Sequence, residues 1–269
     1  MKMTCKHDYH LHSYLSSCSR DAEQTPEHIY SFAKEHGYDS LCVTDHLWDS
    51  LVPGASKWYE HQNVEHVMQN LPLPSGDIPF YFGCETEYCG GEKLGISKEH
   101  FNCFDFIVIP LNHFHMENFT RPAECNTPAL SAELFMTRIE EITRLDLPWR
   151  HIGLAHLTDA FLARPAGKEK LGEVLSNLDY DRVRPFFRFF ADNGVGIELN
   201  GSALSGVIDL FPEEILKFYR LARDCGCKFY CASDAHHLDA LKNVELFSAR
   251  VAEQLELREN DRYQILKRD

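Results

Sequence analysis

The sequence predicts an α/β fold, a closed or distorted β/α barrel of seven parallel strands with helices between them. Short apolar runs alternate with helical patterns along the chain, which is typical of repeated strand–helix units. The runs are apolar on both faces, as in a parallel sheet covered on both sides. A length of 269 residues suits one barrel, and no repeat or linker divides the chain, so we expect a single domain over residues 1–269.

Turn residues bound the apolar runs, and the helical patterns lie between them. The predicted strands cover residues 5–10, 40–44, 80–84, 104–110, 151–155, 196–199 and 228–232. The first helix has an N-cap at Thr25, a proline at Pro26 and a stop at Gly37. The predicted helices cover about residues 25–36, 58–69, 129–145, 181–192, 213–225 and 243–257. Residues 71–76 and 112–128 are predicted loops over the barrel mouth.

The charge balance limits the classes of partner. There are 41 acidic and 27 basic residues, giving a formal net charge of -14, and this field repels nucleic-acid backbones and anionic lipid surfaces. No apolar stretch follows the charges at the N-terminus, and no run approaches the roughly 20 apolar residues that span a bilayer. We therefore expect a cytoplasmic protein that binds neither nucleic acid nor membrane.

The ten cysteines are spread through apolar segments of a chain that is large enough to fold without disulfides. We expect reduced and mostly buried thiols. The closest pairs, Cys225 with Cys227 and Cys227 with Cys231, fit no standard zinc-finger spacing.

Histidines and carboxylates gather where the predicted strands end. His10 and His12 close the first strand, and strand alternation places both imidazoles on one side with Leu11 on the other. Functional residues of β/α barrels lie at the carboxyl ends of the strands. Six of the seven predicted strands deliver such residues there: His10, His12, His46, Glu85, Glu87, His113, His115, His156, Asp234, His236 and His237.

A single histidine at a strand end is usually a hydrogen-bonded structural residue. We give that interpretation to His7, His28, His36, His61, His66, His100 and His151. The repeated strand-end set differs, because a cluster of acids and imidazoles is costly to bury without a cation. Nitrogen and oxygen ligands suit zinc, manganese or iron, and the candidates exceed the four that one tetrahedral ion uses, so we expect more than one metal ion.

Several of these segments, in order along the chain, resemble the motifs of the PHP (polymerase and histidinol phosphatase) superfamily. They are residues 8–13, 44–46, 83–85, the strand led by Asp105 and ending near His113, and residues 155–156, 197–202 and 233–236. The resemblance covers essentially the whole chain. It implies a distorted seven-stranded barrel with a trinuclear metal site that hydrolyses phosphate monoesters, with a metal-bound water as the nucleophile.

The resemblance also implies how the ligands are shared among three divalent ions. One ion takes His10, His12, Glu85 and Asp234, and Glu85 bridges to a second ion held by His113 and His156. The third takes His46 and His236 with a ligand from the loop that follows His12. No separate nucleophilic serine or cysteine is needed.

Two positions depart from the family pattern. The fourth-strand histidine commonly falls seven residues after the strand's aspartate, and that place is Asn112 here, so we choose His113, with His115 as the alternative. In the loop after His12, counting forward reaches Ser17 and Cys18. Counting back from the cap at Thr25 reaches Asp21, which we favour because the cap fixes that register. A thiolate at Cys18 would favour zinc.

The expected partner is a small phosphorylated metabolite, such as histidinol phosphate or a nucleotide or sugar phosphate. Loop arginines Arg20, Arg121 and Arg164 receive no role, since an isolated loop arginine is usually just solvated. One alternative is an amidohydrolase-type C–N hydrolase, although no strand-end lysine is found for its usual carboxylated lysine. Another is a non-catalytic metal-binding PHP module, like one attached to a polymerase.

Overall fold

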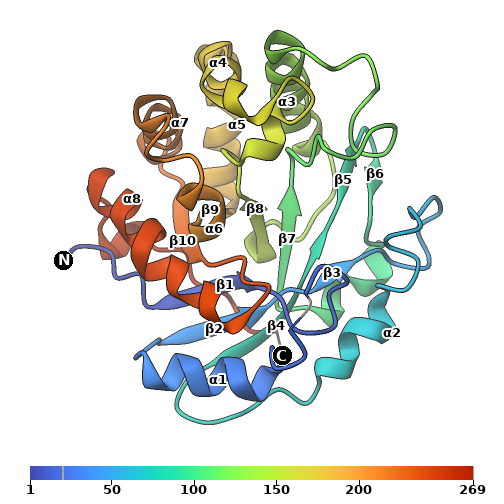
Figure 1. Cartoon of the computed structure of the whole chain (residues 1–269), viewed down its shortest axis with the longest axis vertical. Helices are drawn as coiled ribbons and strands as arrows, with labels where there is room; N and C mark the ends of the chain where they lie inside the picture. The colour runs from blue at the N-terminus through green and yellow to red at the C-terminus, as the bar shows by residue number, and fades with distance from the viewer. Residues whose placement is uncertain (20, 269) are drawn as a thin grey trace.

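The computed structural model describes residues 1–19 and 21–268, and within them seven parallel strands form a nearly closed barrel (Figure 1). Their order around the barrel follows the chain: β1 (His7–Leu11), β2 (Ser40–Val43), β4 (Phe80–Thr86), β7 (Phe106–Pro110), β8 (Ile152–Ala155), β9 (Gly196–Asn200) and β10 (Lys228–Ala232). A two-residue strand, β3 (His46–Leu47), also pairs with β4, and β5 (Tyr88–Gly90) forms an antiparallel hairpin with β6 (Lys93–Leu94). The predicted seven-stranded barrel is confirmed.

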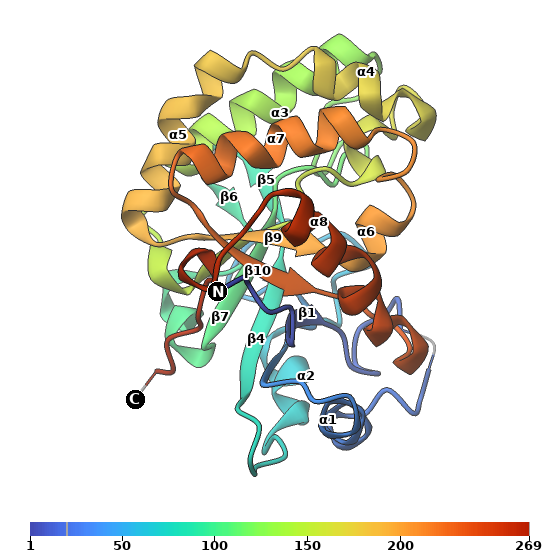
Figure 2. The ribbon, with the colours of Figure 1, turned by 90° about the vertical axis from the view of Figure 1, so that its left-hand side faces the viewer.

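Helices cover the outside of the barrel on opposite sides (Figures 1 and 2). One group contains α3 (Pro128–Ile142), α4 (Leu171–Ser176), α5 (Tyr180–Asn193) and α7 (Pro212–Asp224); the other contains α1 (Pro26–Glu35) and α2 (Val64–Val67). The short α6 (Gly201–Ser205) follows β9, and α8 (Ala249–Gln254) continues a π-helical turn at Val244–Ser248. Further 3₁₀ turns lie at Met68–Asn70, Lys98–Cys103, Trp149–His151, Ala160–Ala163, Lys168–Lys170, Leu238–Lys242 and Glu259–Asp261. None of the helices formed by residues 1–19 and 21–268 is long and apolar enough to cross a membrane.

Two sequence predictions are wrong between β3 and β4. The helix expected over residues 58–69 begins only at Val64, because Asn63 caps it by accepting a hydrogen bond from the His66 backbone N–H. The loop at residues 71–76 leads into the amino end of β4, away from the barrel mouth, and Gly76 packs there against Tyr30 of α1. The loop expected over residues 112–128 does line the mouth, through residues 113–119.

The interior of the barrel is filled by a packed, largely aromatic core, and the cavity described below lies at the carboxyl ends of the strands. Inward side chains from the strands meet two residues of the C-terminal segment that closes the amino end: Tyr9, Cys42, Phe106, Val108, Ala155, Tyr230, Ala232, Tyr263 and Ile265. Gly153 on β8 makes this packing possible, because a Cβ there would lie 2.3 Å from the Phe106 ring and 2.6 Å from the Tyr230 hydroxyl.

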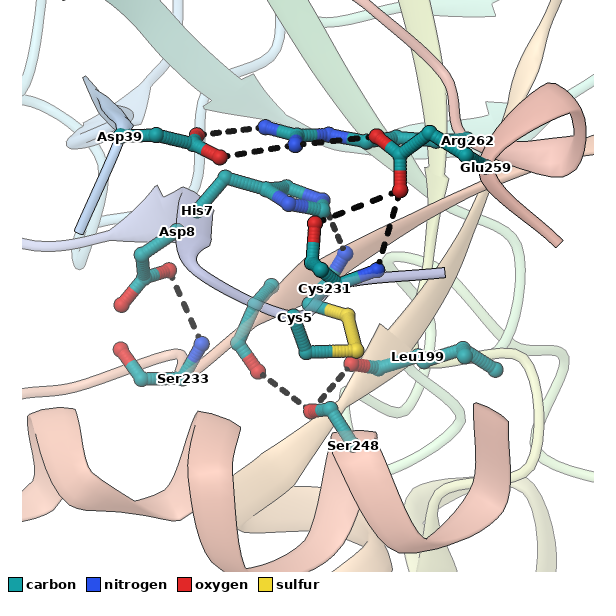
Figure 3. The surroundings of a disulfide bond; sticks show 12 residues. Cys5, His7, Asp8, Asp39, Leu199, Cys231, Ser233, Ser248, Glu259 and Arg262 are labelled. Atoms are coloured by element: carbon teal, nitrogen blue, oxygen red, sulfur yellow. Dashed lines mark hydrogen bonds and ion pairs between the residues drawn. A yellow bond between two sulfur atoms is a disulfide. The ribbon is translucent and has the colours of Figure 1, made fainter. Parts of the chain in front are cut away.

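The seam between the first and last strands closes the barrel. Backbone hydrogen bonds join only their carboxyl ends, where the N–H of Asp234 donates to the His10 carbonyl at 2.8 Å and the N–H of His12 donates to the Ala235 carbonyl at 3.0 Å. Elsewhere along the seam, side chains of β1 accept hydrogen bonds from backbone N–H groups of β10 and of the residue that follows it. His7 Nε2 accepts from Cys231 and the Asp8 carboxylate accepts from Ser233, both at 2.9 Å (Figure 3).

A disulfide between Cys5 and Cys231 lies at the same seam (Figure 3). The expectation of reduced thiols is therefore wrong for this pair, whereas the other eight cysteines of the described residues are free. The two positions are 226 residues apart in sequence, and only the closure of the barrel brings their Cα atoms to 5.8 Å, within the range that a disulfide needs.

The buried histidine of the seam makes stability depend on pH. Burial lowers the pKa of His7 to about 3, whereas an unfolded histidine titrates near 6.5, so below pH 6.5 the unfolded state takes up the proton first and stability falls. We expect chelator-treated protein to lose about 2 kcal/mol more stability between pH 7.5 and pH 5 than a His7→Gln variant, measured by urea unfolding. Equal losses in both proteins would contradict a neutral, buried His7.

Candidate metal centre

Alternation puts His10 and His12 on one side of β1, and an irregularity in the strand turns that side toward the barrel mouth. The pairing of β1 with β2 shifts register between Asp8 and Leu11, so Tyr9 lies in the barrel interior while Leu11 packs in the outer layer under the helices. Strict alternation would put these two side chains on one face, and a bulge of this kind commonly redirects side chains beside functional sites. His10 and His12 are thereby both fully buried at the carboxyl end of the barrel.

Side chains that follow the other strands complete a cluster there. The side chains form three groups, and within each group the candidate ligand atoms all lie within 4.8 Å of one another. The groups are His10, His12 and Asp234; His12, His46 and His236; and Glu85, His113 and His156. The structure therefore brings together eight of the nine residues expected to bind metal. The ninth, Asp21, is not among them.

Glu85 lies at the centre of the cluster and connects its groups. One carboxylate oxygen is 3.4 Å from His10 Nε2 and 3.5 Å from His12 Nε2. The other is 3.3 Å from His156 Nε2 and 3.9 Å from His113 Nε2. This carboxylate faces two sets of imidazoles at once, which is the geometry that a bridging ligand requires.

A partner on the outer side of the cluster orients each of five imidazoles. Each Nδ1 atom contacts a fixed oxygen: His10 with Glu198 at 2.7 Å, His12 with Ser16 at 3.0 Å, His113 with Glu87 at 2.6 Å, His156 with Asn112 at 3.2 Å, and His236 with the carbonyl of Asp234 at 2.9 Å. Metal-binding histidines are typically held in this way, with one ring nitrogen fixed and the other free for the ion.

The electrostatics of the cluster are those of a site built for a cation. Burial alone would raise the pKa of the Glu85 carboxyl, but the imidazoles of His46 and His10 hold it well below its ordinary value. Burial lowers the pKa of His12 to about 3, and His236 and His46 add to this effect, so that imidazole stays neutral. At His156 the carboxylates outweigh burial, and hydrogen bonding to Glu85 raises the pKa of this imidazole to about 9, so protons on such imidazoles balance the ionised carboxylates where no divalent ion does.

Two buried ring nitrogens provide a direct test of whether an ion fits. His10 Nε2 and His46 Nδ1 have no hydrogen-bond partner among the described residues, although both side chains are buried. Such groups are costly to leave unpaired, and both face the Glu85 carboxylate, His46 Nδ1 at 2.9 Å. A divalent ion beside that carboxylate would satisfy them, so the residues present fit a metal centre.

The backbone is strained at two of these residues. His156 follows β8 with a φ of 28°, and Asp234 follows β10 with a φ of 53°, values that non-glycine residues rarely adopt. Strain of this kind persists where surrounding contacts enforce it, and it concentrates at functional sites. Here the His156 N–H donates to Glu198 and the Asp234 N–H donates to His10, which hold both turns.

A cavity of about 650 Å³ opens directly above the cluster. Its lining combines cluster residues with an apolar wall of Trp58, Tyr59, Met116, Phe119 and Phe161. Among the described lining residues, Lys57 is the one lysine or arginine. Arg121 is buried and donates to four backbone carbonyls and to Glu117, so it stabilises its loop; Arg20 lies outside the described residues.

Two alternatives left by the sequence are now placed in space. His113 lies in the cluster, whereas His115 lies against the Phe161 ring at 4.2 Å and is outside the three groups. Cys18 lines the cavity beside His46 and His236. Asp21 is not a lining residue, and its carboxylate accepts the backbone N–H of Glu23 at 2.9 Å.

Sequence reasoning missed the residues that support the cluster from outside. Glu198 is fully buried in β9, between His10 and His156, and a carboxylate inside an apolar strand was the available signal. The role of Asp45 was also missed. Asp45 accepts hydrogen bonds from Ser13 and from Ser16, and the Ser16 hydroxyl contacts His12. No local pattern reveals this link, because it joins two strand ends about 30 residues apart.

A barrel with imidazoles and carboxylates converging at its mouth defines a class of proteins built around a metal centre. The PHP domain family matches residues 8–202, so this chain belongs to that family. No curated protein matches it closely enough to identify a relative.

Two solved structures share the fold. Histidinol phosphate phosphatase HisK from Lactococcus lactis, solved with zinc, L-histidinol and phosphate, is 17% identical with a TM-score of 0.57 and covers 97% of this chain and 99% of its own. A protein named as histidinol phosphatase HisK from Listeria monocytogenes is 13% identical with a TM-score of 0.54, covering 87% of this chain and 97% of its own. At these identities the likeness establishes the barrel.

Glu198 offers a test of the outer partners. We expect Glu198→Gln to weaken zinc binding about 10- to 100-fold, because the amide has one acceptor oxygen for the two positions at which Glu198 now contacts His10 Nδ1 and accepts from the His156 N–H. Competition with a chromogenic chelator measures this change. Glu213→Gln, at an exposed carboxylate in the first turn of α7, is the control and should bind zinc like the wild type. Unchanged zinc affinity in Glu198→Gln would contradict the positioning role.

Proposed function

We propose that this protein is a metal-dependent phosphoesterase that hydrolyses a small phosphate monoester. The observation that carries the proposal is the convergence of three ligand groups on Glu85 beneath an open cavity. Membership in the PHP family and the fold shared with HisK, which was solved with zinc, L-histidinol and phosphate, support the same activity.

We assign the metal ligands to three ions, which zinc, manganese or iron could supply. His10, His12 and Asp234 would hold the first ion, and Glu85 would bridge from it to a second ion held by His113 and His156. His46 and His236 would hold the third ion together with one more ligand. When bound, such ions polarise the phosphate and supply a nucleophilic water at neutral pH.

The residues of the chain prepare the site for this reaction. Glu198 and Glu87 hold the rings of His10 and His113, so the ligands need no reorganisation during the reaction. Glu87 is fixed in turn by the Tyr59 hydroxyl, which donates to it at 2.7 Å. Lys57 is the one lysine or arginine among the described lining residues, so neutralisation of the phosphate oxygens falls chiefly to the metal centre.

The cavity wall favours an organic group with an apolar or aromatic surface. Trp58, Phe119 and Phe161 offer faces against which such a group can pack, and their burial by substrate would exclude water from the reacting phosphate. Histidinol phosphate fits this description, and other small phosphorylated metabolites with a flat or apolar part fit it as well.

A phosphatase assay tests the proposal directly. Purified protein is stripped with a chelator, reloaded with zinc or manganese, and assayed against an aryl phosphate, histidinol phosphate, a sugar phosphate and a nucleoside monophosphate. We expect hydrolysis that disappears on stripping and returns on reloading. Full activity in the stripped protein, or a metal-loaded protein inert toward every phosphate ester, would contradict the proposal.

The two glutamates that close β4 separate a bridging ligand from a supporting one. We expect Glu85→Gln to lower kcat/KM more than about 100-fold and to lose bound metal, because its carboxylate faces both sets of imidazoles. Glu87→Gln should lower kcat/KM about 10- to 100-fold, since Glu87 acts through the ring of His113. Elemental analysis and the phosphatase assay measure both variants. A damaging Glu87→Gln beside a silent Glu85→Gln would reverse the assignment.

A further inference from the structure

The loop that follows β1 forms a tight turn at residues 13–19, which places one of its side chains beside the candidate metal ligands. The N–H of Ser16 donates to the Ser13 carbonyl, and the N–H of Ser19 donates to the Ser16 carbonyl at 2.9 Å. Two hydrogen bonds to segments distant in sequence fix the turn to the rest of the site. The Ser17 N–H donates to the Gln62 side chain at 2.8 Å, and the Ser19 hydroxyl donates to the His236 carbonyl at 3.1 Å. Cys18 lies between these two anchors.

The thiol of Cys18 faces the metal centre. Cys18 lines the cavity beside the rings of His46 and His236, and it is the one cysteine among the described residues of that lining. The Ser19 contact with the His236 carbonyl holds the two segments together. The side chain is only partly buried, so a ligand entering the cavity can reach it.

An independent observation concerns a buried ring nitrogen at this corner of the site. His46 is 8% exposed, and its Nδ1 makes no hydrogen bond within the described residues, although it lies 2.9 Å from a carboxylate oxygen of Glu85, where a shared cation would fit. His12 lies within reach of both His46 and the His10–Asp234 group. If His12 serves the latter, only the two imidazoles of His46 and His236 remain for the third ion, short of the four ligands that tetrahedral zinc takes.

Asp21 is held away from this corner. Its carboxylate accepts the Glu23 N–H at 2.9 Å, and its carbonyl accepts the Gln24 N–H at 3.0 Å, an arrangement that turns the chain toward α1. The Gln24 side chain donates to the carbonyls of His12 and Ala235, which fastens this second turn to the barrel seam. The turn after β1, and not the cap of the helix, therefore decides which side chain of this loop faces the cavity.

We infer that Cys18 is the loop ligand of the third metal ion and binds it as a thiolate together with His46 and His236. This inference rests on the proposed metal-dependent function and adds a sulfur donor to a site otherwise built from nitrogen and oxygen. The thiol releases its proton to solvent when the sulfur–metal bond forms. A soft thiolate biases this position toward zinc over manganese.

Cobalt(II) reports on the inference without any activity assay, since a cobalt–thiolate bond gives an intense charge-transfer band in the near ultraviolet. Stripped protein is titrated with cobalt(II) chloride, and absorption and bound cobalt are recorded. We expect the band in the wild type, its loss in Cys18→Ser together with one equivalent of cobalt, and its loss in Cys18→Asp with the cobalt retained. Cys18→Asp should also bind manganese more tightly than the wild type does, because its carboxylate is a hard ligand.

Matched controls distinguish Cys18 from the other candidates. Cys103→Ser, at an exposed cysteine, and Asp21→Asn should both keep the band and the full cobalt content. A band that survives in Cys18→Ser, or the loss of a cobalt equivalent in Asp21→Asn alone, would overturn the inference. If wild-type protein binds cobalt with visible bands but without the charge-transfer band, Cys18 is not a ligand, whereas the proposed metal centre is still supported. Failure to bind any cobalt would overturn both.

Discussion

Closure of the barrel between β1 and β10 is the constraint on which the candidate site depends. His10 and His12 lie at the end of the first strand, while Asp234 and His236 follow the last, so the candidate ligands come together only where these ends meet. An isolated bridge joins these ends, and nearby the side chains of His7 and Asp8 accept the backbone N–H groups of Cys231 and Ser233. The seam thus satisfies buried donors that would otherwise be unpaired, and it sets the spacing of the ligands.

The chain prepares a site that is stable only with positive charge at its centre. Glu85, Glu198 and Asp234 gather among imidazoles in a buried environment, where unpaired carboxylates carry a large desolvation cost. Hydrogen bonds on the outer side of the rings fix their orientation, and the left-handed turns at His156 and Asp234 are held by backbone contacts to the same network. Divalent ions would replace protons as the balancing charge, which links the architecture to the proposed hydrolysis.

The sequence was informative wherever local pattern and geometry coincide. Strand alternation placed His10 opposite Leu11, and strand ends located Glu85 and His156, because parallel strands deliver their carboxyl ends to one rim. In the loop after His12 the two counts disagreed, since an irregular turn gives no register: the forward count reached Cys18, which lines the cavity, and the count back from Thr25 reached Asp21, which does not.

Contacts between distant segments escaped prediction for a related physical reason. Glu198 beside His10, and Cys5 joined to Cys231, meet only after the barrel closes, and neither spacing carries a local signal. The helix predicted over residues 58–69 begins only after Asn63, and Trp58 and Tyr59 line the cavity instead.

Anomalous diffraction at the zinc absorption edge, from crystals of zinc-loaded protein, would locate the ions directly. We expect more than one peak inside the barrel mouth, with the Glu85 carboxylate between them and histidine nitrogens about 2.0–2.1 Å from the ions. Zinc found only at surface sites, with Glu85 and its surrounding imidazoles free of metal, would contradict a metal centre at the barrel mouth.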